Sequence, residues 1–265
     1  MSIHPTLLKI FNVLSLMAVT STAAIFGRDV FKAYSHPHLL QVDIWGYGAP
    51  ILVTLLVVGF PIAQWFDSAH DVIVEAVSWH FAVSNLVVSF WIFCWYQGWM
   101  VLSEVAIVLN FILVWRVYTK MRVFTATNLL TYASIHVAFS VYSSVAWIDI
   151  FQNFFAAFTD ETSSNPFIVA LALGSLLTLT GLGWYQAELS RDPDSWSAAT
   201  IIFSIYAIVY YQSEQEDPAR SIIVLGLIAL GFLFNSFARR GIRNIEIIRG
   251  RDDIISNDER RGLLG

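Results

Sequence analysis

The chain has 265 residues, of which 57% are hydrophobic and 13% are charged, and its net charge is −5. Soluble domains carry about 25% charged residues, so this composition and the mean hydropathy of +0.63 indicate a membrane protein. The acidic balance argues against a nucleic acid as partner. With Cys94 as its one cysteine, the chain has neither a disulfide framework nor a cysteine-based metal site.

Apolar runs of the length that a membrane-spanning helix needs, about 20 residues, recur along the chain. We expect an all-α polytopic helical bundle over residues 1–238 and a polar, arginine-rich cytosolic tail over residues 239–265. The first run lacks a clear small-residue cleavage site, so we expect it to be a retained span. The seventh run is the shortest, which leaves a seven-span bundle as the alternative. The eight expected spans cover residues 7–27, 46–66, 76–96, 99–118, 128–158, 166–185, 196–212 and 221–238.

The basic residues divide unequally between the two sides of an eight-span bundle. Twelve of them lie on the side of the two termini, against three on the other side, Arg28, Lys32 and Arg220. The positive-inside rule then predicts that both termini are cytosolic. Within the tail, Glu259 followed by Leu263 and Leu264 has the form of an acidic dileucine sorting signal, which makes a vacuolar or endosomal membrane an alternative location.

Tryptophans gather around one expected helical hairpin. Trp91 and Trp95 are four residues apart and therefore share a helix face. Gln97 and Gly98 interrupt the apolar run, and Trp99 opens the next one. Indole rings suit the membrane interface, where the ring is buried and the N–H can find a partner.

Glu104, His136 and Asp149, together with His80 in the third span, fall at membrane depth, where ionisable groups are costly and often functional. They could form an acid–base pair or a proton relay. The alternative is that the polar face around Asp149 only joins helices through hydrogen bonds.

Motifs specific for catalysis or metal binding are missing from the sequence, which favours a non-enzymatic protein. There is no glycine-rich phosphate loop and no G-x-S-x-G elbow. His36 and His38 are the one close histidine pair and lack a third ligand, so we expect no metal site. None of the three lysines lies in a late span, where a retinal Schiff base would need it.

Several of these residues together resemble the tryptophan-rich TspO/MBR family of membrane proteins, in particular its longer, about eight-span members. The resemblance covers about residues 30–158. It depends on Pro37-x7-Trp45-Gly46, on Trp91-x3-Trp95 followed by Ser103, and on Tyr142-x10-Asn153. The chain departs from the family pattern at Val88, Ala138 and Val145, where Asn, Pro and Trp are expected.

The resemblance implies a protein that binds apolar, ring-shaped molecules, such as tetrapyrroles or sterols, in an aromatic pocket among the first five spans. It implies that the ligand-binding residues are Trp45, Trp91, Trp95, Tyr142 and Asn153. The expected partners are therefore the lipid bilayer and a hydrophobic small molecule, with a homodimer as a further alternative. Two other functions stay open, a proton-coupled transporter using Glu104, His136 and Asp149, and a membrane-embedded lipid or terpenoid enzyme.

Overall fold

The structure is a computed structural model, and its described parts are helical throughout. It describes residues 5–34, 38–41, 57–66, 69–126, 128–159, 165–189, 194–215 and 219–239. Every regular element within these ranges is a helix, which confirms the predicted all-α class. Trp45, most of the expected second span, and the tail with Glu259, Leu263 and Leu264 lie outside the described residues.

Within the described ranges, five helices are long and apolar enough to cross a membrane. The chain is thus a polytopic membrane protein. Two further helices, α3 and α8, have 18 and 19 residues and lie within the same bundle, but polar and aromatic side chains lower their mean hydropathy. The five apolar segments are Pro5–Arg28, Met100–Met121, Leu129–Phe158, Pro166–Leu189 and Arg220–Arg239.

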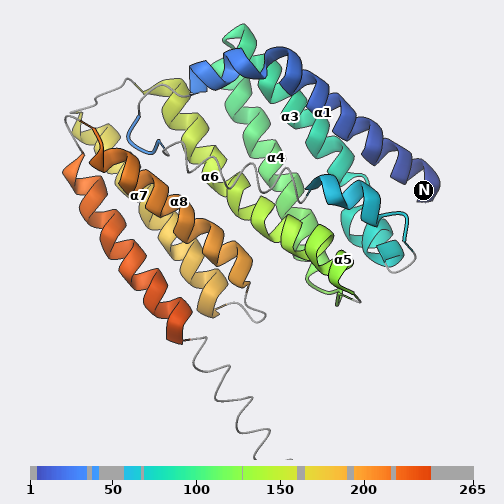
Figure 1. Cartoon of the computed structure of the whole chain (residues 1–265). Coiled ribbons are helices and arrows are strands. Elements are labelled where there is room, and N and C mark those ends of the chain that lie inside the picture. Colours follow the sequence, from blue (N-terminus) through green and yellow to red (C-terminus); the bar gives the residue numbers. More distant parts are fainter. Residues whose placement is uncertain are drawn as a thin grey trace, which may run out of the picture.

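The helices form a bundle (Figure 1). On one side, α3 (His80–Gln97) packs against α1 (Pro5–Tyr34) and α4 (Met100–Met121). On the other side lie α7 (Pro166–Trp184), α8 (Ser195–Ser213) and the final helix (Arg220–Arg239). The Pro5 end of α1 and the Arg239 end of the final helix lie at the same end of the bundle, as an eight-span topology requires.

The expected fifth span is one continuous helix of 30 residues and occupies the centre of the bundle. It comprises α5 (Leu129–Thr131), a π-helical turn η4 (Tyr132–Val137) and α6 (Ala138–Phe158). Two further π-helical turns, η3 (Val72–Val77) and η5 (Tyr185–Leu189), precede α3 and follow α7. Asn128 begins the long helix because its side-chain Oδ1 accepts the Thr131 backbone N–H at 2.8 Å.

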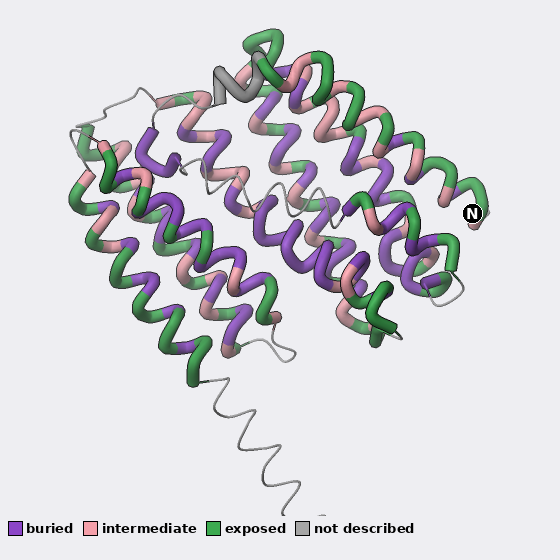
Figure 2. Tube along the Cα trace, in the orientation of Figure 1, coloured by how far each residue is buried: buried purple, intermediate pink, exposed green. Residues whose placement is uncertain are grey.

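Two hydrophobic cores meet on α6. Phe139 of α6 packs edge-on against Phe60 and Phe81, with ring centroids 5.7 and 6.1 Å away, in a core shared with α4. Farther along α6, Ile148 and Phe155 belong to a second core with α7, α8 and the final helix. Figure 2 shows the buried residues on the inner faces and exposed residues on the outer faces of the peripheral helices. Many of the exposed side chains are large and apolar, which suits contact with lipid.

Two positions show why glycine is required. Gly98 adopts φ +73° and reverses the chain between α3 and α4, while the Trp99 N–H donates to the Cys94 carbonyl at 2.8 Å. This confirms the expected hairpin. In the final helix, a Cβ on Gly226 would clash with the side chain of Val209 of α8. The two helices therefore pack backbone to side chain at this point.

One helix end differs from the sequence-based expectation. The first helix continues to Tyr34 instead of ending near Gly27. Arg28 is polar but helix-compatible, and Gly27 has room for a Cβ, so nothing local stops the helix there.

Candidate functional site

The candidate site centres on Asn153 of α6, which joins two tryptophans of α3. The indole N–H groups of Trp91 and Trp95 both donate to Asn153 Oδ1, each at 2.7 Å. Asn153 is fully buried, and Trp91 is partly exposed. Because an indole can only donate, the oxygen of Asn153 must be the atom that faces the two rings.

The amide nitrogen of Asn153 extends the cluster to α4. It donates to Glu104 Oε2 at 2.6 Å and to Ser103 Oγ at 3.3 Å. Asn153 thus uses two acceptor and two donor positions, its full hydrogen-bonding capacity. Glu104 is partly exposed. The cluster therefore presents one carboxyl group beside two oriented indoles.

Local structure explains this convergence. Trp91 and Trp95 are one turn apart near the C-terminal end of α3. The left-handed turn at Gly98 brings the first turns of α4, with Ser103 and Glu104, beside them. Ile92 and Trp95 form a small core, against which pack the apolar side chains of Val19, Phe26, Val88, Met100, Ala156 and Ala157.

Tyr142 lies in a separate polar cluster, three turns earlier on α6. Its hydroxyl lies 3.2 Å from Ser84 Oγ and donates to Asn110 Oδ1 at 3.2 Å, and Ser84 also donates to Asn110 at 2.6 Å. All three side chains are buried. Their partners are one another, so the cluster joins α3, α4 and α6 in the way expected for interhelical hydrogen bonds.

The other two ionisable residues are separated from each other. Asp149 lies one turn before Asn153 on α6 and makes no hydrogen bond to any residue that the structure describes. His136 lies in the π-helical turn, 13 residues from Asp149, or roughly 20 Å along the helix. His136 therefore cannot contact Asp149 directly.

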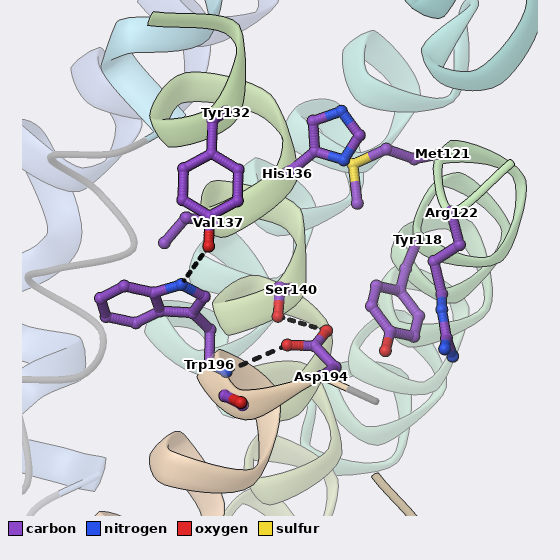
Figure 3. A pocket seen from close by; sticks show the side chains of 10 residues that line it. Tyr118, Met121, Arg122, Tyr132, His136, Val137, Ser140, Asp194 and Trp196 are labelled. Atoms are coloured by element: carbon purple, nitrogen blue, oxygen red, sulfur yellow. Dashed lines mark hydrogen bonds between the residues drawn. The ribbon is translucent and has the colours of Figure 1, made fainter. Parts of the chain in front are cut away.

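His136 instead lines a cavity of about 260 Å³ at the end of the bundle where α4 ends and α8 begins (Figure 3). The sequence did not single out this cavity. Its walls come from three segments far apart in the chain, so no local sequence pattern predicts it. The lining residues are Tyr118, Met121, Arg122, Tyr132, His136, Val137, Ser140, Asp194, Ser195 and Trp196.

Other partners of the site also escaped sequence reasoning. Asn85, near the position where the family pattern expects an asparagine, donates to Ser15 Oγ of α1 at 3.1 Å. Ser84 and Asn110 gave no signal beyond being polar residues in apolar helices. Only the packing of α3 against α1 and α4 decides which of these polar residues meet.

Comparison with known proteins places the chain. No curated protein and no solved structure matched the sequence. A family model described as TSPO-like protein matches residues 7–238, which is most of the chain and includes all of the described helices except the first residues of α1 and the last residue of the final helix. The paired tryptophans, the asparagine that joins them and the polytopic helical bundle all lie within this match, and the chain belongs to the TSPO-like protein family.

Proposed function

We propose that this TSPO-like membrane protein binds a hydrophobic, ring-shaped ligand, a tetrapyrrole or a sterol, beside Trp91 and Trp95. The observation that supports the proposal is the double hydrogen bond from the two indoles to Asn153 Oδ1. It fixes the orientation of both rings before a ligand arrives. A preorganised aromatic surface binds more tightly because less side-chain entropy is lost on binding.

The surroundings of the two indoles suit such a ligand. Ligand pockets in proteins are mainly apolar and aromatic, with a few polar groups that fix orientation. Val88, Phe26 and two alanines supply the apolar surface here. Glu104 supplies the polar group, and its hydrogen bond to Asn153 couples it to the rings.

A fluorescence titration of the purified protein tests the proposal. Protoporphyrin IX absorbs where tryptophan emits, so its binding quenches the protein, and a sterol is tested by competition. We expect Trp95→Ala to raise the dissociation constant at least tenfold. Trp65→Phe is the matched control. Trp65 is 55% exposed, and its ring contacts Lys9 near the start of α1, 17 residues before Phe26, which packs beside the two indoles. Equal binding by wild type and Trp95→Ala would contradict the proposal.

A second candidate is proton-coupled transport, supported by the position of Asp149 one turn from the Asn153–Glu104 contact. A carboxyl group at membrane depth without a hydrogen-bond partner in the described part of the chain is a candidate proton carrier. In proteoliposomes, pH-driven flux should fall in Asp149→Asn. Flux that depends on neither the pH gradient nor this substitution would exclude proton-coupled transport through Asp149.

A further inference from the structure

The cavity beneath the ends of α4 and α8 has the features of a second binding site. In Figure 3, Tyr132 and Trp196 stand on one side, Tyr118 and Arg122 on the other, and Asp194 lies between them. Its volume of about 260 Å³ is below the roughly 300–1,000 Å³ of pockets that enclose a drug-sized ligand. It therefore suits a polar headgroup better than a whole macrocycle.

The cavity lies at one end of the bundle, the level at which the ends of spanning helices meet lipid headgroups. Two apolar helices end or begin around it, α4 at Met121 and the long central helix at Leu129, and α8 begins there at Ser195. Tyr132 and Trp196 are 42% and 46% exposed, and the Trp196 indole donates to the Tyr132 hydroxyl at 2.9 Å. Tyrosine and tryptophan concentrate at this level of membrane proteins because their rings are apolar and their tips polar.

The walls carry one fixed negative and one fixed positive charge. Asp194 is held in place because its Oδ1 accepts the backbone N–H groups of Trp196 and Ser197, at 3.1 and 3.0 Å. Its Oδ2 accepts the Ser140 hydroxyl at 2.5 Å. The Arg122 guanidinium lies over the Tyr118 ring, 5.5 Å from its centroid. A lining with both signs of charge suits a group that is neutral overall and carries both signs itself.

His136 supplies a polar atom that no described residue pairs with. Its Nε2 is buried and has no hydrogen-bond partner among the described residues. Buried polar atoms nearly always have a partner. A group that occupies the cavity could provide one, since His136 lines it.

We infer that this cavity binds the headgroup of a zwitterionic phospholipid. The ammonium group lies near Asp194 and the faces of Tyr132 and Trp196, where a carboxylate and cation–π attraction both favour a cation. The phosphate lies near Arg122. The acyl chains leave the cavity towards Leu129, an exposed residue three positions before Tyr132 in the chain. The site is independent of the proposed ring-ligand site, since His136 and Asn153 are 17 residues apart, or roughly 25 Å along the central helix.

Titration of short-chain lipids, followed by native mass spectrometry of the detergent-purified protein, tests the inference. Dihexanoyl-phosphatidylethanolamine and dihexanoyl-phosphatidylcholine are compared with the anionic dihexanoyl-phosphatidylglycerol. We expect at least one zwitterionic lipid to bind at least tenfold more tightly than the anionic one. Equal or tighter binding of phosphatidylglycerol would overturn the inference. Free phosphoethanolamine is the further arm, and if it binds as tightly as the lipid, the ligand is a soluble zwitterion and the lipid assignment is wrong.

Variants locate the binding. Arg122→Gln and His136→Gln should each weaken zwitterionic lipid binding at least fivefold. Arg239→Gln is the matched control, because Arg239 is an exposed arginine at the same end of the bundle, bonded to Asn235. Thermal unfolding without lipid shows whether each variant is folded. His136→Gln keeps a polar side chain and serves as the second test if Arg122→Gln does not fold. Wild-type affinity for the zwitterionic lipid in both folded variants would overturn the inference. Porphyrin binding at Trp95 should be the same in both variants as in wild type, because the two sites are independent.

Discussion

The indole N–H of Trp95 and the side-chain oxygen of Asn153 lie 2.7 Å apart and join α3 to α6 in the interior of the bundle. Trp91 donates to the same oxygen. One amide oxygen therefore accepts both indole N–H groups, and its loss would remove both hydrogen bonds at once.

Asn153→Ala should destabilise the protein by about 1–3 kcal/mol, because buried donors and a carboxyl group lose their partner at once. The tryptophan emission should also change, since two indole N–H groups are affected. Unfolding in detergent, followed by fluorescence, measures both. Asn235→Ala on the exposed surface is the control and should stay within about 0.5 kcal/mol of wild type. A fully stable Asn153→Ala protein would show that the indoles find other partners.

Gly226→Ala should destabilise the bundle by about 1–3 kcal/mol because the new Cβ meets Val209. On the same helix, Gly231 has open space around its Cβ position, so Gly231→Ala should be neutral or stabilising by up to about 1 kcal/mol. Thermal unfolding of both variants compares them. The double variant Gly226→Ala/Val209→Ala should recover part of the lost stability. If it does not, Val209 is not the residue that clashes with the new Cβ.

Tyr142→Phe should cost about 1 kcal/mol or less, because the Ser84–Asn110 hydrogen bond of 2.6 Å survives the change. Asn110→Leu should cost more, since both Ser84 and Tyr142 lose their acceptor. Tyr206→Phe on the exposed surface is the control. Unfolding midpoints should fall in the order Tyr206→Phe, Tyr142→Phe, Asn110→Leu. The reverse order for the last two would contradict the shared-acceptor geometry.

Burial of His38 should make the stability depend on pH. Its carbonyl and that of Leu39 accept the Gln212 amide, and burial lowers the pKa of the His38 imidazole from 6.5 to about 3. Between these values the unfolded chain binds a proton that the folded protein does not. Stability should therefore fall as the pH drops below 6.5, by up to about 1 kcal/mol per pH unit.

Unfolding measured at pH 7.5 and 5.5 tests this dependence. His38→Leu should show a weaker decline than wild type. His70→Leu serves as the control, because it removes an exposed histidine far from the Gln212 contact. An unchanged slope in His38→Leu would mean that another group causes the pH dependence.

The sequence predicted the helical class and the shared helix face of Trp91 and Trp95, for identifiable reasons. Four-residue spacing alone puts Trp91 and Trp95 on one face, and the cost of a charge at membrane depth singles out Glu104. Periodicity does not say which helix a face will meet. Three features therefore could not be predicted, because they depend on packing between distant segments. They are the Ser84–Asn110–Tyr142 cluster, the π-helical turn at His136 and the cavity around it.

The position of α6 between two cores has a consequence for how such a chain could have grown. If the later helices had been added to a complete bundle, the last helix of that bundle would be packed against a core on one face and would face lipid on the other. Here Phe139 and Phe155 of a single helix are buried in different cores. A protein truncated after Phe158 would therefore leave Ile148 and Phe155 without the side chains of α7, α8 and the final helix that bury them here, so the packing of this central helix depends on both halves of the chain.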